Sequence, residues 1–308
     1  MDSLIESLGE HHTLLWLAGG YFGMVAVERV WRAWSDARKP GAPRYDDRDA
    51  LCSMGLNLMN SLLMLGLAIL VPLAVYVWVY ESFRLTTLES LWVSVPVAFV
   101  LHELGYYLDH RLGHRVGLLW AFHAIHHSSN EFNHSTAARG FLLDGQLKVV
   151  GAVAAAFLGV PPVVYVAVTV LKLVFGIWNH ASWVGHLGWL ERVLMTPLNH
   201  KIHHANQPQY IDRNYGQVLM IWDKMFGSHA EHGEPPTVGL VNPVYDNNPL
   251  TAQFAGLRQL GAKMAGAERW QDKLAYLWRP PEWSHDGSCV SDCPKYAATD
   301  AGLVAGDA

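Results

Sequence analysis

The sequence predicts an all-α integral membrane protein with about three spanning helices, a proline-centred membrane hairpin and a helical cap on the cytoplasmic side. Of its 308 residues 51% are hydrophobic and only 16% are charged, whereas a soluble domain has roughly a quarter charged residues. The apolar residues are collected in four long segments. Histidine is enriched: 17 are present, and most lie between His102 and His232. The net charge of −5 excludes a basic nucleic-acid-binding surface, and three cysteines exclude a disulfide framework.

The apolar segments are interpreted in chain order. Residues 13–30 are long enough, at about 1.5 Å per residue, to cross most of a bilayer core of about 30 Å. Residues 31–49 are polar and rich in arginine. Residues 51–80 are apolar almost throughout, with a kink expected at Pro72, and residues 88–107 form a third apolar segment. Because the N-terminus lacks a basic region, we expect no cleaved secretory signal.

A fourth apolar segment, residues 147–178, is interrupted by Pro161 and Pro162. Each half is short for a full span, so the segment is expected to enter the membrane and return to the same side. If the arginine-rich loop is cytoplasmic, both histidine-rich regions face the cytoplasm. Glu28 and Arg29, at the end of the first apolar segment, are then expected among lipid headgroups.

The whole chain, 1–308, is therefore interpreted as one membrane-embedded domain in a multi-pass protein, placed in a bacterial inner membrane. Its parts are transmembrane helices at 13–107, a first histidine region at 108–146, the membrane hairpin at 147–179, a second histidine region at 180–250, and a C-terminal amphipathic helix (251–278) and tail within 251–308. A soluble helical protein with a very apolar core is the alternative. The thirty-residue apolar run at 51–80 argues against it, since buried helices of soluble proteins seldom stay apolar for so long.

The histidines that could bind metal fall into three clusters and two isolated positions. His110 and His114 are four residues apart, as are His123 and His127, so each pair shares one face of a helix and can bind one ion. His126 is one residue off that face and is expected to point to a neighbouring ion. The pattern H-x-x-H-H, which occurs twice, therefore indicates a site for two metals. The candidate ligands are His110, His114, His123, His126, His127, His180, His186, His200, His203 and His204.

Imidazole ligands suit iron, zinc, copper and nickel, whereas magnesium and calcium prefer oxygen. A structural zinc site needs only four ligands, which eight to ten histidines exceed. Two ions with four or five nitrogen ligands each fit the number present. The spacing alone does not separate iron from zinc.

Six motifs extend the pattern: YLDHRLGH at 107–114, HAIHH at 123–127, SSNEFN at 128–133, HKIHH at 200–204, YIDRNYG at 210–216 and WDKMFG at 222–227. Together they resemble the fatty acid hydroxylase and sterol desaturase superfamily of integral-membrane, non-haem di-iron enzymes. Within it they are most similar to the branch that contains alkylglycerol monooxygenase. The resemblance covers about residues 50–285.

The resemblance implies an O2-dependent hydroxylation of a C–H bond in a membrane lipid, with a fatty acyl, ether-lipid or sterol-like substrate. It implies that the three clusters and one isolated histidine, best matched by His180, hold two iron ions, for which zinc can substitute in a purified sample. His186 stands where some hydroxylases have a further ligand. Glu131, Asp212, Asn214 and Asp223 are the candidates to accept ring N–H bonds and orient the ligands, against the alternative of ordinary loop polarity.

Other polar residues carry open alternatives. His102 either lines the substrate path or makes an ordinary buried hydrogen bond. His134 departs from the pattern of the branch, and its role stays open. Arg139 either neutralises a carboxylate or lipid headgroup, or lies at the interface as a surface arginine. Cys289 and Cys293 are too isolated to indicate a redox or metal site.

The sequence has no haem motif, dinucleotide loop or cysteine run for an iron–sulfur cluster. An external electron donor is therefore expected: a reductase, ferredoxin, cytochrome or reduced pterin. A lipid or sterol desaturase at the same site remains the nearest alternative. A histidine-rich metal transporter is disfavoured because transporter ligands usually lie near the bilayer midplane. A zinc hydrolase would need Glu103 or Glu131 as a general base.

Overall fold

The computed structural model describes residues 11–38, 45–64, 70–241 and 245–288. These ranges contain helices and turns, two isolated β-bridges (Leu194–Leu219 and Ala205–Val238) and no strand, which confirms the all-helical prediction. The helices are α2 (His11–Asp36), α3 (Asp47–Met64), α4 (Leu70–Phe83), α5 (Leu91–Arg115), α6 (Gly117–His127), α7 (Val149–Leu158), α8 (Pro162–Trp178), α9 (Pro197–His203), α10 (Ile221–Met225), α11 (Pro249–Gln253), α12 (Ala255–Gly266) and α13 (Trp270–Trp278), with short 3-10 helices η1 (Thr136–Ala138), η2 (Gln146–Lys148) and η3 (Gly188–Arg192).

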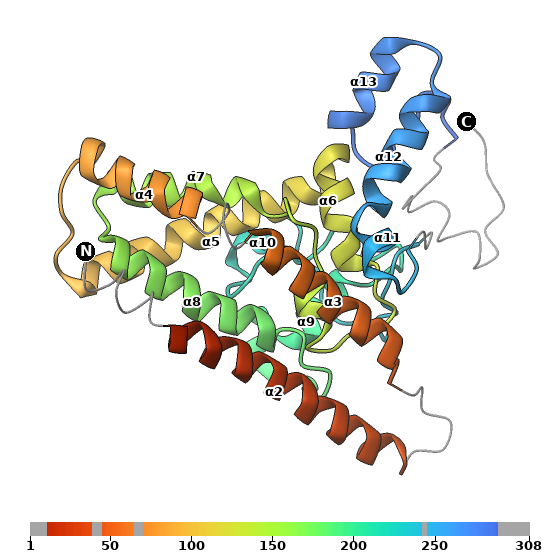
Figure 1. Ribbon diagram of the computed structural model, residues 1–308, viewed down its shortest axis with the longest axis horizontal. Helices are drawn as coiled ribbons and strands as arrows, with labels where there is room; N and C mark the ends of the chain where they lie inside the picture. The colour runs from red at the N-terminus through yellow and green to blue at the C-terminus, as the bar shows by residue number, and fades with distance from the viewer. Residues whose placement is uncertain (1–10, 39–44, 65–69, 242–244, 289–308) are drawn as a thin grey trace.

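Helix α5 is the axis of the fold. It packs against α6, α7 and α8 and runs through the molecule from the α4–α7 end toward α6 (Figure 1). Among the described residues it is the one helix both long and apolar enough to cross a membrane. Its 25 residues correspond to about 37 Å at 1.5 Å per residue. Trp92, near its start, is 92% exposed, whereas its last two turns carry His110 and His114.

The segment predicted as a hairpin forms two helices, α7 and α8, which meet at Gly159–Pro161. Gly159 has φ +89°, and a Cβ there would lie 1.8 Å from the Thr86 carbonyl oxygen, so only glycine fits this turn. Both helices pack on α5, and a shared apolar core joins them to α4 through Tyr76, Ala98, Ala155 and Val164. This arrangement puts the polar ends of α5 and α8 beside each other.

The long apolar run predicted at 51–80 is divided between α3 and α4. Pro72 falls in the first turn of α4, where a missing backbone N–H does no harm, so the kink expected within a long helix is not found there. Residues 65–69 lie outside the described residues. Helix α3 packs against η1 and α11, which places it beside the histidine-rich region and not in the α4–α5–α7–α8 bundle.

The cap is made of α6 and the C-terminal helices, which project from one end of the molecule (Figure 1). The single amphipathic helix predicted at 251–278 is three helices, α11, α12 and α13. The chain breaks so that Leu260, Ala267 and Tyr276 can all pack against Ala121 of α6. The tail with Cys289 and Cys293 lies outside the described residues, as do Lys39 and Arg44.

Candidate dimetal centre

Nine of the ten predicted ligands come together in two adjoining groups. The first group contains His110, His114, His123, His127 and His203, and the second contains His126, His180, His200 and His204. Within each group, one ring nitrogen from every member lies within 4.8 Å of all the others. The prediction that His126 points away from the His123–His127 face toward a second ion is therefore matched by its place in the second group.

These rings come from four parts of the chain: the end of α5, α6, the residues after α8, and α9 with the residue that follows it. Only Val116 separates α5 from α6, so the histidines at the end of α5 face those of α6. His180 follows the end of α8. Helix α9 starts with Pro197 after Thr196, whose side chain accepts the Asn199 N–H, a usual way to begin a helix. His200 and His203 lie on α9, and His204 follows directly after it.

The Nε2 atoms point inward in both groups. In the first, the His127 Nε2 lies 3.2 Å from that of His114, 3.1 Å from that of His123 and 3.2 Å from that of His203. In the second, the Nε2 atoms of His180 and His204 each lie 3.2 Å from that of His200. Ligands at about 2.1 Å from one ion would be separated by roughly 3.0–3.4 Å, so these spacings fit one ion per group.

Hydrogen bonds at Nδ1 fix the rings of the first group. His123 Nδ1 donates to the Asp144 carboxylate at 2.9 Å, and His114 Nδ1 lies 3.3 Å from that of Asp212. The other acceptors are backbone carbonyls: Tyr215 for His110 and Arg213 for His203, both at 2.8 Å. A ring that donates from Nδ1 keeps its Nε2 lone pair free for a metal.

Carbonyl oxygens alone are the Nδ1 acceptors found for the second group. His126 donates to the Arg139 carbonyl and His180 to the Gly176 carbonyl, each at 3.0 Å. The two groups therefore differ electrostatically, because two rings of the first group contact carboxylates. A carboxylate acceptor makes an imidazole a stronger donor to a metal than a carbonyl does.

Burial keeps five of these rings neutral, which is the form that binds metals. Burial and the neighbouring His123 ring lower the pKa of His126 to about 4. Burial also lowers the pKa of His203 to about 3, and lowers the pKa values of His127, His200 and His204 far below the usual 6.5. All of these groups are uncharged at pH 7.

The donor set fits two metal ions on further grounds. The His110 Nε2 is buried without a hydrogen-bond partner, and its Nδ1 is already used, so Nε2 is oriented toward the first group with nothing to bind. A buried polar atom normally has a partner, and a metal ion would provide one for this nitrogen. Five and four nitrogens suit iron or zinc.

The loop at 212–215 is the main outer support of the first group, because it supplies acceptors to three of its rings. Asp212 and Asn214 have φ values of 61° and 56°, a left-handed conformation that Asp and Asn adopt more readily than most residues. The Asp223 carboxylate in turn accepts the Tyr215 and Gly216 N–H groups, both at 2.8 Å.

Of the four predicted ring acceptors, only Asp212 contacts a ligand ring. Burial raises the pKa of Asp212 to about 6, against the effect of Arg115. The prediction is wrong for Asn214, whose side chain bonds to the backbone of Asn199 and Ala230, and for Asp223; both hold the loop in shape. It is also wrong for Glu131, whose hydrogen bonds within the 128–139 loop are backbone contacts with the Ser129 and Thr136 hydroxyls. Sequence reasoning missed Asp144, which no motif marks.

His186 is not part of either group. The chain turns after His180, and the His186 Nδ1 accepts the Gly188 N–H at 3.1 Å. Its ring faces a separate cavity that is also lined by Trp189 and His229. The prediction that His186 is a ligand is therefore corrected: among the described histidines, nine converge and His186 faces elsewhere.

His102 makes an ordinary hydrogen bond, one of its two predicted roles, at a half-buried position. Its Nδ1 lies 2.7 Å from the Lys172 Nζ, and Lys172 also pairs with Glu103 at 2.7 Å. This pairing occupies Glu103, which a zinc hydrolase would need as a free general base.

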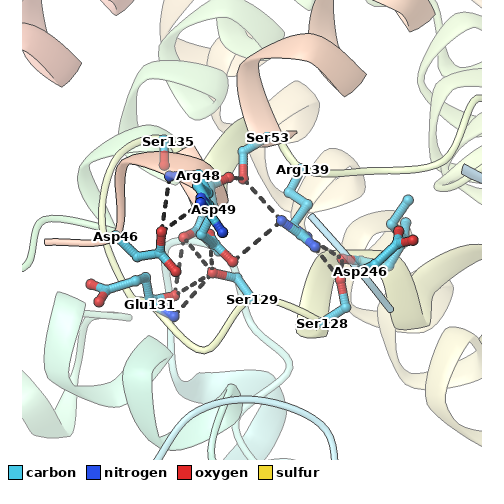
Figure 2. Close-up of polar contacts among 12 residues, drawn as sticks. Asp46, Arg48, Asp49, Ser53, Ser128, Ser129, Glu131, Ser135, Arg139 and Asp246 are labelled. Atoms are coloured by element: carbon cyan, nitrogen blue, oxygen red, sulfur yellow. Dashed lines mark hydrogen bonds and ion pairs between the residues drawn. The ribbon is translucent and has the colours of Figure 1, made fainter. Parts of the chain in front are cut away.

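Arg139 neutralises the carboxylate of Asp49, which is one of its two predicted roles. It is not a surface residue. Its side chain is 1% exposed and lies 3.4 Å from Asp49, and it donates to Ser128 and to the Ile125 carbonyl. Figure 2 shows the network, in which Ser129 donates to Asp49 at 2.6 Å. The network fixes the 128–139 segment, whose Arg139 carbonyl orients His126.

A cavity of about 320 Å³ reaches both groups. Its wall includes His110 and His123 from the first group and His126 and His180 from the second, and its apolar lining includes Phe141, Leu173 and Ile177. Leu173 and Ile177 belong to α8, the helix whose exposed side bears apolar residues such as Leu171 and Val174. A hydrocarbon chain in this cavity would lie next to rings of both groups.

Comparison with known proteins gives a consistent picture. The fatty acid hydroxylase family profile matches residues 95–228. The chain is 33% identical to alkylglycerol monooxygenase of Homo sapiens over 265 residues, and 31% identical to that of Danio rerio over 266 residues. These matches cover 85% and 86% of the chain but 58% of each relative, so the chain spans less than three fifths of their length.

A bacterial relative matches a smaller part. Ornithine lipid hydroxylase OlsE of Rhizobium tropici is 29% identical over 148 residues, which is 48% of the chain and 45% of that protein. No solved structure matches. With the profile match enclosing most of α5, all of α6 and α9, and both histidine groups, the chain belongs to the fatty acid hydroxylase and sterol desaturase superfamily, in the branch that contains alkylglycerol monooxygenase.

Proposed function

We propose that this protein hydroxylates a C–H bond in a membrane lipid with O2, at a centre of two iron ions held by the nine converging histidines. The observation that carries the proposal is the 320 Å³ cavity, whose wall combines rings of both groups with the apolar side chains of α8. A volume of this size is typical of sites that bind small molecules or parts of larger ones.

The reaction consumes one O2, two electrons and two protons; one oxygen atom enters the lipid C–H bond as a hydroxyl and the other leaves as water. The two iron ions, when bound, would supply the O2 activation. The protein positions the ligands through Asp144, Asp212 and the 212–215 loop, and it excludes water by burying the rings. The apolar wall orients the alkyl chain.

The relatives support a lipid substrate through their names, which specify an alkylglycerol and an ornithine lipid. The apolar part of the cavity wall, which includes Phe141, Leu173 and Ile177, suits the alkyl chain of such a lipid. We propose a lipid of this class, with its chain in the cavity and its headgroup at the polar mouth near Asn57 and Lys148.

The proposed orientation of the protein in the membrane is based on α5. If α5 crosses the bilayer, its exposed Trp92 lies toward one face and His110 and His114 toward the other. Glu28, about two turns before the end of α2, contacts His134 and Ser182 beside the histidine groups. Arg29 and Arg32, on the same helix, therefore lie at this end of the molecule, and by the positive-inside rule they favour the cytoplasm for it. We propose a multi-pass protein with a cytoplasmic metal centre and a separate electron donor.

The test is to measure metal content and turnover in parallel. Purified protein in lipid nanodiscs should hold about two iron ions per chain and convert an alkyl-chain lipid to a hydroxylated product when O2 and a reductant are supplied. His126→Ala and His203→Ala should each lose activity and bound metal together. Full activity in either variant, or no O2-dependent product from any lipid class, would contradict the proposal, and weak exchangeable binding with metal uptake would favour a transporter.

A further inference from the structure

The first helix of the protein contributes a buried carboxylate beside the second histidine group. Glu28, on α2, is 2% exposed, although its neighbour Arg29 pairs with Asp47 on the surface. This corrects the expectation that Glu28 lies among headgroups. Burying a carboxylate is costly unless its oxygens receive hydrogen bonds, so a position like this needs a structural or functional reason.

Both oxygens of Glu28 are fully engaged. Oε2 accepts the backbone N–H and the Nδ1–H of His134, each at 2.7 Å. Oε1 accepts the backbone N–H of Ser182 at 2.9 Å and its hydroxyl at 2.6 Å. One side chain thus joins two segments that are 48 residues apart in sequence. Tyr21, two turns earlier on the same face of α2, also donates to the His134 carbonyl at 3.2 Å.

The two joined segments carry parts of the second group. Ser182 is two residues beyond His180. His134 is two residues beyond Phe132, whose ring stacks on His180 with centroids 5.4 Å apart and planes at 25°. The same Phe132 ring lies 5.5 Å from the ring of His204. Fixing Ser182 and His134 on one carboxylate therefore fixes the His180 ring against Phe132.

The first group does not depend on this contact. Its rings are held by Asp144, Asp212 and the 212–215 loop, and the segments joined by Glu28 carry none of its ligands. The second group lacks a carboxylate on any described ring, and its His200 Nδ1 is buried without a hydrogen-bond partner. Fewer direct hydrogen bonds therefore fix the rings of the second group, and its geometry depends more on contacts between the segments that carry it.

The structure assigns Glu28 the role of a positioning residue for the second metal ion: through His134 and Ser182 it holds His180 in place, so that α2 is part of the metal centre's framework. This inference rests on the two-metal centre of the proposed function. Loss of the Glu28 hydrogen bonds should weaken the affinity for the second ion and not for the first. The expected decrease is about 10- to 100-fold, which is what outer-shell partners of metal ligands typically contribute.

The experiment follows metal release from zinc-loaded protein with a chromophoric chelator. Glu28→Gln keeps the size of the side chain but turns an amide NH2 toward one pair of donors. We expect one of the two ions to leave at least ten times faster and the other to leave at the wild-type rate. Arg29→Gln removes a surface ion pair from the next position of the same helix and should release both ions normally. Ser182→Ala, which removes one of four donors, should accelerate the same ion less.

A double variant separates positioning from general destabilisation. His126→Ala alone should leave one tightly held ion in the first group, and adding Glu28→Gln should leave that ion in place. Normal release of both ions from Glu28→Gln, or loss of the first-group ion in the double variant, would overturn the inference. If wild-type protein itself fails to hold two ions, the two-metal centre fails instead, and the two failures are distinguishable.

Discussion

The contact between Asp144 and His123 offers the sharpest test of the first metal site. Its carboxylate accepts the His123 Nδ1–H at 2.9 Å, and its side chain is 27% exposed. Asp144→Leu removes this acceptor without touching any ligand. A hydrogen bond to a charged acceptor contributes about 1.5–3 kcal/mol, which corresponds to roughly 10- to 150-fold in an equilibrium constant. Losses of 10- to 100-fold in metal affinity are typical when such partners are removed.

The assay is competition between apoprotein and a chelator of known zinc affinity. We expect one of the two dissociation constants to rise 10- to 100-fold in Asp144→Leu and the other to stay unchanged. Asp144→Asn, which can still accept through its amide oxygen, should show a smaller rise. Asp272→Asn, at a surface pair with Arg269, is the control and should leave both constants unchanged. Equal constants in Asp144→Leu and wild type would refute the assignment.

The same carboxylate predicts a pH dependence of the metal-free protein. Burial opposes ionisation, but the His123 ring outweighs it and lowers the pKa of Asp144 from 3.8 to about 2. A carboxyl group with a lowered folded-state pKa stabilises the fold above its unfolded pKa, and this contribution disappears as the pH falls through the folded value. The free energy of unfolding should therefore exceed that of Asp144→Asn by about 2 kcal/mol at pH 5, and the difference should vanish near pH 2.

Three further predictions concern residues outside the ligand set. His186→Ala should keep two bound metals and wild-type turnover, because the His186 ring faces a separate cavity. Loss of one ion, measured by mass spectrometry of the metal content, would show that His186 is a ligand. Arg139→Met should lower the free energy of unfolding in detergent by about 3–5 kcal/mol, since it leaves Asp49 buried and unpaired; a change below about 1 kcal/mol would contradict the network in Figure 2. Ile177→Trp should shift turnover toward lipids with shorter chains at unchanged metal content, and an unchanged chain-length profile would place the substrate elsewhere.

Much of the centre could be predicted because helical spacing and ligand chemistry are local properties. The four-residue intervals place His110 with His114 and His123 with His127, and they separate His126 from that face. The division of the ligands into two groups follows from these intervals and from the number of histidines. The break between α7 and α8 at Pro161 could also be predicted, because two prolines and a glycine end a helix.

The remaining features depend on contacts between segments far apart in the chain. His186 resembles a ligand in sequence but is turned away by its bond to Gly188, which no spacing rule reveals. Four ring acceptors are backbone carbonyls, and a carbonyl has no signature in sequence. Asp144 and Glu28 are single carboxylates whose partners lie 21 and 106 residues away. The C-terminal helices divide because α6 offers them a surface, which the amphipathic pattern at 251–278 does not show.

If a centre of two metals inserts oxygen from O2 into a membrane lipid, the product carries an atom of that O2. The most direct test is turnover under ¹⁸O₂ by the iron-loaded protein in nanodiscs, followed by mass spectrometry of the lipid. We predict one ¹⁸O atom in each product molecule, and none when His126→Ala replaces the wild type. An unlabelled product with a new double bond would show desaturation instead, and an unlabelled hydroxyl or an unchanged lipid would contradict the account.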